Sequence, residues 1–239
     1  MYRSSSRTDG TNKCLVIRGE TLVMNVSKNL MLNMIITLIQ LVAKICNATS
    51  KRFWHWYLRV YCSFHGVRLQ KKCPPHFWGM AYLNIEKGAR MSIGEDFICR
   101  SNPLYSIDCG LASKIFVKKE AELIIGDFSG ISNTIIHCHN SIRIGNHVNI
   151  GAGTLIMDSN FHSTDWRQRL ERKTDVQNAQ TKPVSIGDNV FIGARCIICK
   201  GTVIGDNSMI CAGSTVIGNI PPNELWGGSP AKFIKKLPD

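Results

Sequence analysis

Aliphatic residues recur at every sixth position through the C-terminal half of the chain. The unbroken series is Ile186, Ile192, Ile198, Ile204, Ile210 and Val216. An earlier series with the same phase is Ile144, Ile150 and Ile156, and weaker matches start at Ile93 and Ile125. The positions directly after these aliphatic residues are mostly small, as in Gly187, Gly193, Cys199, Gly205 and Cys211.

A period of six excludes the two commonest regular structures. In an α-helix, residues six apart would lie about 600° around the axis and face different directions. A half-buried strand instead alternates with a period of two over a short stretch. A period of six predicts short flat strands with one inward aliphatic side chain each and a small residue at each corner. Three such units make a coil of about 18 residues, and stacked coils form a parallel β-helix.

The repeat is interrupted once and ends before the C-terminus. Residues 157–183 lack the aliphatic phase, so we expect a long loop leaving a rigid scaffold, which is where functional residues concentrate. The Pro221–Pro222 pair stops the strand pattern. The sequence therefore predicts a β-helix over 77–220, with degenerate coils over 77–119, and a C-terminal tail over 221–239.

The N-terminal third differs from the rest in charge. Residues 1–76 hold 12 Lys and Arg against two acids, a net charge of 12 − 2 = +10, whereas residues 77–239 hold 17 against 15, a net charge of +2. Polar side chains form one narrow stripe over 27–46 and another over 51–65, which predicts two helices within a basic, aromatic region spanning 27–76. Residues 1–26 are expected to be disordered, and Met24 is a candidate for the natural start.

Two interpretations of this helical region stay open. Residues 27–72 either contact a membrane surface, with aromatic side chains on one side and basic flanks, or form a helical hairpin packed on the β-helix or on a partner subunit. No nucleic-acid-binding module is recognisable.

The ten cysteines form no compact disulfide framework, and no cleavable signal peptide precedes them. A reducing cytoplasm is therefore the expected compartment. Cys196 and Cys199 form a C-x-x-C pair, but both fall in small-residue positions of the repeat. We interpret them as packing residues rather than metal ligands.

The segments IGNHVNIGAGTLIMDSNFH and PVSIGDNVFIGARCIICKGTVIGDNSMICAGSTVIGNIPPNELWGGSPAKFIKKL resemble the hexapeptide-repeat acyltransferases, most closely the sugar O-acetyltransferases. The resemblance covers about residues 120–237. It implies a left-handed β-helix, a homotrimer with active sites between subunits, and acetyl-CoA as the acyl donor, with no metal. The implied reaction moves an acetyl group to a hydroxyl of a sugar or glycan precursor. The location would be cytoplasmic, at the inner face of the plasma membrane if the N-terminal helices bind lipid.

The same resemblance implies three catalytic residues. His162 matches the general base at the entrance to the family's loop, and an imidazole suits this role because its pKa lies near the operating pH. Asp158 or Asp165 is expected to orient the imidazole. Asn133 lies 12 residues before Gly145, the spacing of an acceptor-site asparagine in the family, although a structural turn explains it almost as well.

Acetyl-CoA in these enzymes lies along small residues on the outside of the coils, and basic residues near the C-terminus approach its phosphates. The positions that match this track are Gly193, Ala194, Cys211, Ala212, Ser214, Lys232 and Lys235. One departure is Ile217-Gly218, where relatives often have Thr-Lys.

Two rival functions follow from the same scaffold. His137, His139, His147 and His162 suggest the zinc site of γ-class carbonic anhydrases, which share the β-helix. A non-catalytic scaffold would bind no CoA. The sequence does not separate a hydroxyl from an amine acceptor, nor an acetyl from a longer acyl group.

Overall fold

The computed structural model of this 239-residue chain describes residues 34, 37–38, 52–70, 75–101 and 112–238. The chain divides into two compact units, Met1–Ala48 and Thr49–Asp239, and every element below belongs to the second. Of the helix expected over 27–46, Met34, Thr37 and Leu38 are described and are helical. The expected disorder over 1–26 and the start at Met24 lie outside the described residues.

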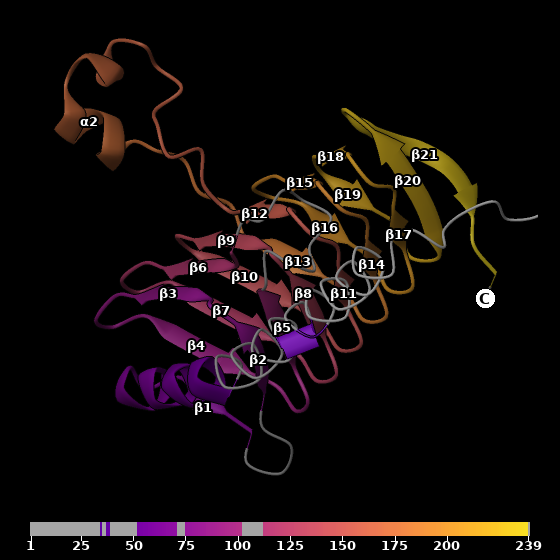
Figure 1. The fold of residues 1–239 in the computed structure, drawn as a ribbon. Coiled ribbons are helices and arrows are strands. Elements are labelled where there is room, and N and C mark those ends of the chain that lie inside the picture. The colour runs from indigo at the N-terminus through magenta and orange to yellow at the C-terminus, as the bar shows by residue number, and fades with distance from the viewer. Residues whose placement is uncertain (1–33, 35–36, 39–51, 71–74, 102–111, 239) are drawn as a thin grey trace, which may run out of the picture. The chain divides into compact units, whose positions relative to one another are not determined.

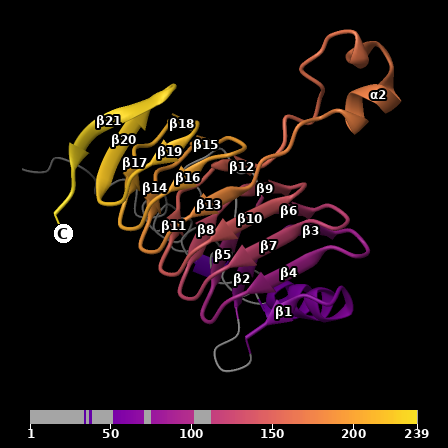
Figure 2. The same ribbon diagram turned by 180° about the vertical axis from the view of Figure 1, so that it is seen from behind.

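The second unit is a parallel β-helix made of three sheets (Figures 1 and 2). From β1 to β20, paired strands are parallel and lie three places apart in the chain, so successive strands belong to different sheets and three strands make one coil. The first sheet contains β1 (Arg68–Leu69), β4 (Arg90–Ile93), β7 (Glu122–Ile125), β10 (Ser141–Ile144), β13 (Val184–Ile186), β16 (Val203–Ile204) and β19 (Asn219–Ile220). The second contains β2 (His76–Gly79), β5 (Ile98–Ser101), β8 (Gly130–Ser132), β11 (Asn149–Ile150), β14 (Phe191–Ile192), β17 (Met209–Ile210), β20 (Glu224–Gly228) and β21 (Ala231–Lys236). The third contains β3 (Tyr82–Ile85), β6 (Lys114–Val117), β9 (Ile135–Cys138), β12 (Leu155–Met157), β15 (Ile197–Ile198) and β18 (Thr215–Val216).

The predicted coil of 18 residues is confirmed where the repeat is unbroken. Ile186 pairs with Ile204, a separation of 204 − 186 = 18 residues, and Ile192 pairs with Ile210 at the same separation. All of the repeated isoleucines over 186–210 are buried. The weaker sequence matches are also in register, because Ile93 pairs with Ile125 and Ile125 with Ile144. Aliphatic side chains therefore stack in continuous columns along the sheets, and these columns form the core.

The Gly-Asp and Gly-Asn pairs after the isoleucines form a ladder along one corner of the coils. The Asp188 carboxylate accepts a hydrogen bond from the Asn146 backbone N–H at 2.7 Å, and the Asp206 carboxylate accepts one from Asp188 N–H at 2.8 Å. The preceding glycines are required by stacking. A Cβ on Gly205 would lie 2.4 Å from the backbone nitrogen of Pro222 in the next coil.

Among the described residues, Cys62, Cys99, Cys138 and Cys196 are free thiols buried in the core, as the sequence predicted for Cys196, whereas Cys199 and Cys211 are half-buried. The Cys196 side chain is fully buried, and its Sγ lies 3.1 Å from the Cys211 carbonyl oxygen, to which it donates. Burial raises the pKa of Cys62, Cys99 and Cys138 to about 12. These positions therefore behave as small apolar residues.

Both ends of the β-helix differ from the sequence-based boundaries. A helix over residues 52–64 buries Leu58 and Cys62 against the first coil, close to the helix expected over 51–65. The first coil begins at β1, before residue 77, because the apolar Val67 and Leu69 join the core. At the other end, β20 and β21 pair antiparallel and extend the second sheet, so the segment expected as a tail is a hairpin. Within the described residues, no helix is long and apolar enough to span a membrane.

The expected loop leaves the coils between β12 and β13 (Figure 1). Ile144 pairs with Ile186, so this coil spans 186 − 144 = 42 residues, 24 more than the regular coil of 18. The loop contains the short helices η2 (Gln168–Leu170) and α2 (Arg172–Gln177). Its two arms are joined at the base, where Asn160 N–H donates to the Gln180 carbonyl at 3.0 Å and Lys182 N–H to the Asp158 carbonyl at 2.9 Å.

Candidate active site

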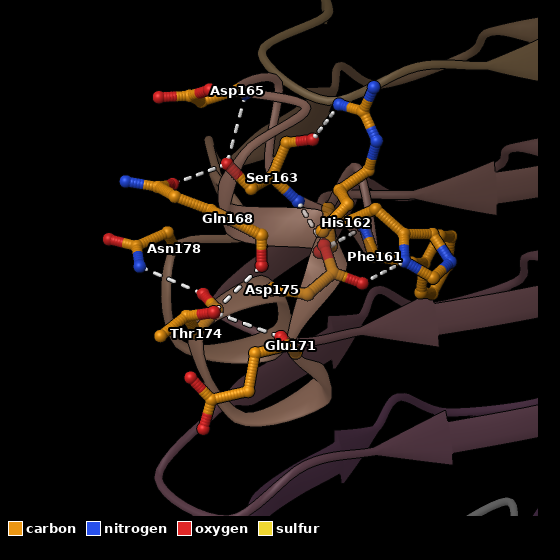
Figure 3. Close-up of polar contacts among 11 residues, drawn as sticks. Phe161, His162, Ser163, Asp165, Gln168, Glu171, Thr174, Asp175 and Asn178 are labelled. Carbon is orange, nitrogen blue, oxygen red and sulfur yellow. Dashed lines mark hydrogen bonds and ion pairs between the residues drawn. The ribbon is translucent and has the colours of Figure 1, made fainter.

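A histidine–aspartate pair lies at the centre of the loop (Figure 3). The Nδ1 atom of His162 is 2.6 Å from Oδ2 of Asp175, and Oδ1 of the same carboxylate accepts the Ser163 backbone N–H at 2.8 Å. The His162 side chain is 67% exposed, whereas that of Asp175 is 10% exposed. The pair thus has a buried, anchored carboxylate and an imidazole open to solvent.

Hydrogen bonds within the loop hold this pair in place. Ser163 Oγ donates to the Gln168 side-chain oxygen at 2.5 Å, and Arg169 donates to the Ser163 carbonyl at 2.7 Å. Thr174 Oγ1 lies 2.7 Å from the Gln168 carbonyl and 2.9 Å from the Glu171 carbonyl, which ties α2 to η2 (Figure 3). Hydrogen bonds between its own polar groups therefore hold the loop together.

The contacts of Asp175 define which nitrogen of His162 is basic. The hydrogen bond from His162, and then that from Ser163 N–H, lower the pKa of Asp175, so it is ionised at neutral pH. An ionised carboxylate only accepts hydrogen bonds, so Nδ1 carries the imidazole hydrogen. In the neutral imidazole, Nε2 then carries no hydrogen and has the lone pair that can accept a proton. This arrangement suits a general base, with the carboxylate fixing the tautomer and orientation.

The carboxylate beside the imidazole is not one of the two that the sequence predicted. Asp158 is fully buried, and its two oxygens accept the backbone N–H groups of His139 at 2.7 Å and Asn140 at 2.8 Å. Asp165 instead binds the side chain of Arg167 at 3.0 and 2.8 Å. Asp158 therefore closes the turn after β9, and Asp175 replaces it as the residue that contacts His162.

Sequence reasoning missed Asp175 because the loop has no period that relates position 162 to position 175. The available signal was chemical: a base of this kind needs a carboxylate, and Asp175 is one of few acidic residues in the loop.

Asn133 lies in the turn directly after β8. It is buried and adopts a positive φ of 41°, a conformation that asparagine tolerates better than most residues. Its backbone N–H donates to the Arg100 carbonyl at 2.8 Å, and its carbonyl accepts from Gly153 N–H at 3.2 Å. These bonds link three successive coils, and its role toward an acceptor stays a prediction.

The positions predicted to bind CoA lie on the last coils and the C-terminal hairpin. A Cβ on Gly193 would lie 2.4 Å from Ala212 N, so coil stacking itself requires a small residue there. Ser214 is fully buried, and its hydroxyl donates to the Cys211 carbonyl at 2.6 Å and accepts Gly228 N–H at 3.1 Å. The remaining positions are the half-buried Ala194 and Cys211, the exposed Ala212, and the exposed Lys232 and Lys235 of β21.

A cluster of four rings joins the loop to the third sheet. The ring centroids of His137 and His139 lie 5.4 and 5.1 Å from that of Phe161, and 5.5 and 5.6 Å from that of Phe116. Burial lowers the pKa of both histidines, against the opposing effect of the Asp158 carboxylate. Because Phe161 directly precedes His162, this cluster anchors the backbone next to the candidate base. Within the part of the chain that the structure describes, no three His, Cys, Asp or Glu side chains gather as a metal site.

Comparisons with known proteins agree with the repeat. Residues 183–217 match the family model described as the hexapeptide repeat of succinyl-transferase. A putative acetyltransferase of Schizosaccharomyces pombe is 38% identical over 96 residues, which cover 40% of this chain and 44% of that protein. The galactoside O-acetyltransferase of Escherichia coli is 47% identical over 57 residues, covering 24% and 28%. The mitochondrial gamma carbonic anhydrase 2 of Arabidopsis thaliana is 33% identical over 113 residues, covering 39% and 38%.

Solved structures agree with the fold. The polySia-specific acetyltransferase NeuO superposes with a TM-score of 0.55 at 20% identity, covering 68% of each chain. The chain spans less than half the length of the curated relatives named above. The predicted resemblance to hexapeptide-repeat acyltransferases and the predicted left-handed β-helix are both confirmed.

Proposed function

We propose that this hexapeptide-repeat, left-handed β-helix protein is an acetyltransferase that moves an acetyl group from acetyl-CoA to a hydroxyl of a sugar or glycan precursor. The observation that carries the proposal is the 2.6 Å contact between His162 Nδ1 and Asp175, which leaves Nε2 of an exposed imidazole as a base. Relatives named as acetyltransferases support the reaction class.

The proposed transfer is direct. His162 Nε2 takes the hydroxyl proton of the acceptor as the acceptor oxygen attacks the thioester carbonyl. The tetrahedral intermediate then breaks its C–S bond, and the imidazolium returns the proton to the CoA thiolate. Asp175 stabilises the imidazolium in between, since its carboxylate already faces Nδ1.

The proposed CoA track runs along Gly193, Ala194, Cys211, Ala212 and Ser214, with Lys232 and Lys235 near the phosphates. The exposed lysines and the absence of bulky side chains at these five positions support this assignment. Ser214 supports the track through its small size, because its hydroxyl is used within the fold.

The proposed acceptor class rests on the relative named as a galactoside O-acetyltransferase. The proposed assembly is a homotrimer, in which a neighbouring subunit completes the acceptor site. The proposed location is the cytoplasm at the inner face of the plasma membrane, with residues 27–72 as the contact.

Calorimetric titration of acetyl-CoA, combined with release of CoA thiol in the presence of a panel of methyl glycosides, tests the proposal. We expect His162→Ala to bind acetyl-CoA like the wild type and to lose about 10²- to 10⁴-fold in turnover. His147→Asn is the matched control, because His147 is exposed at a corner with φ of 55° where other coils carry Asn189 and Asn207. Absence of acetyl-CoA binding to the wild type would overturn the proposal.

The carbonic anhydrase alternative is favoured by the 33% identity to gamma carbonic anhydrase 2 and by the neighbouring His137 and His139. Stoichiometric zinc in the purified protein, together with CO₂ hydration that a chelator abolishes, would support it. The scaffold alternative predicts neither CoA binding nor metal.

A further inference from the structure

The helix over residues 52–64 is held on the β-helix by one face. Leu58 and Cys62 are 1% and 0% exposed and belong to the core that continues into the first coil. His55 Nδ1 accepts the Phe77 backbone N–H at 3.4 Å, which ties the same face to β2. The rotation of the helix about its axis is therefore set by these contacts.

This rotation turns a row of aromatic side chains outward, which we call the aromatic stripe. Its members are Phe53, Trp56, Tyr57 and Phe64, which are 53%, 61%, 42% and 85% exposed. Relative to Phe53 they stand at i+3, i+4 and i+11, which places them on one face of a helix. Phe53 and Tyr57 stack on each other with ring centroids 6.3 Å apart. Large apolar side chains exposed in such a row indicate a surface that is covered in use.

The charged residues of this helix are all positive. Arg52 and Arg59 are exposed on the same helix, and residues 52–64 contain no Asp or Glu. This helix lies within the segment 1–76, whose net charge is +10. Aromatic side chains beside arginines, without acids, complement a layer that is apolar below and anionic above. The interface of a bilayer containing anionic lipids has this chemistry.

We infer that the aromatic stripe inserts into the interfacial layer of an anionic bilayer while Arg52 and Arg59 contact the headgroup phosphates. The helix lies beside the first coil, drawn in indigo next to β1 in Figure 2, so the membrane faces that end of the β-helix. The loop with His162 leaves the β-helix after β12, three coils beyond the first coil. Because neighbouring coils stack at about 4.8 Å, the point where the loop leaves lies about 15 Å along the β-helix from the first coil.

The inferred orientation gains strength from the proposed homotrimer, and this step rests on that proposal. Cyclic symmetry places three copies of the aromatic stripe at the same end of the assembly. Three weak contacts that engage one surface raise the apparent affinity well above that of a single stripe.

Co-sedimentation of the full chain with vesicles tests the inference. We expect binding to phosphatidylcholine vesicles that contain phosphatidylglycerol, weak binding to phosphatidylcholine alone, and loss of binding at high salt. Trp56→Ser should weaken binding about tenfold, and the Arg52→Gln/Arg59→Gln variant about thirtyfold. Trp166→Ser is the matched control, since Trp166 is 63% exposed but lies in the loop.

Other outcomes overturn the inference. Equal binding of wild type and Trp56→Ser would show that the aromatic stripe does not touch lipid. If Trp56→Ser instead lowers the mass measured by light scattering and leaves vesicle binding unchanged, a second copy of the chain covers the stripe. Release of CoA thiol with a soluble acceptor should be the same for Trp56→Ser and wild type, so failure of this inference is distinguishable from failure of the proposed function.

Discussion

Replacing Asp175 with asparagine should disable the candidate base by reversing its tautomer. Ser163 N–H is a fixed backbone donor 2.8 Å from one carboxylate oxygen, so the asparagine must turn its only oxygen toward it. The amide NH₂ then faces Nδ1 of His162, which was 2.6 Å from the other carboxylate oxygen. Nδ1 has to accept that hydrogen bond, so the imidazole hydrogen moves to Nε2. The atom that should take the acceptor proton is then already protonated.

The expected loss follows from this reversal. General-base catalysis contributes about 10²- to 10⁴-fold, and a wrong tautomer removes most of it, as in serine proteases with the equivalent change. Asp175→Ala removes the orienting group but does not impose the wrong tautomer. We therefore expect Asp175→Asn to be the slower of the two variants, although its side chain has nearly the size and shape of the original. The assay is release of CoA thiol from acetyl-CoA with a methyl glycoside, and also with water as the acceptor.

Asp165→Asn is the matched control, because Asp165 lies in the same loop and binds Arg167 rather than His162. It should retain turnover within a few-fold of the wild type. The reasoning is refuted if Asp175→Asn stays within about threefold of the wild type while acetyl-CoA binding is unchanged. It is also refuted if Asp175→Ala proves slower than Asp175→Asn at equal folding by circular dichroism.

Three further predictions concern stability and donor binding. Gly205→Ala should lower the free energy of unfolding by about 3 kcal/mol in a urea titration, because its Cβ would lie 2.4 Å from the backbone of the next coil. Gly130→Ala is the control: the nearest atom to its Cβ would be at 3.5 Å, so the free energy of unfolding should change by less than about 1 kcal/mol. Because the pKa of His137 is lowered in the folded protein, the unfolded chain binds a proton at this residue more readily. The melting temperature should therefore fall as the pH drops below the histidine pKa of the unfolded chain, about 6.5, and His137→Gln should reduce that fall. An unchanged dependence of melting temperature on pH in His137→Gln would contradict this. Lys232→Gln with Lys235→Gln should raise KM for acetyl-CoA about tenfold at constant kcat, and a change confined to kcat would remove these lysines from the CoA track.

The architecture could be predicted almost completely from the sequence. The isoleucines over 186–210 pair at the predicted offset, and even the weak match at Ile93 marks a true coil position. Each coil packs on its neighbours in the same way, so the same six-residue pattern of aliphatic and small residues repeats along the chain. The boundaries were less predictable. The start of the first coil at Arg68 and the hairpin of β20 and β21 depart from the repeat, because the end coils have only one neighbour.

The candidate site divides in the same way between sequence and structure. His162 was identified from the sequence through its resemblance to the hexapeptide-repeat acyltransferases, which have a general base at the entrance to their loop. Its partner Asp175 was decided by tertiary structure, because a loop without a period gives no rule for which of its carboxylates turns inward. The tertiary structure also determines the role of Asp158, because its two carboxylate oxygens accept backbone N–H groups from the turn after β9. Likewise, the sequence determined that residues 52–64 are aromatic and basic, but only the packing of Leu58 and Cys62 on the first coil decided which side chains face outward.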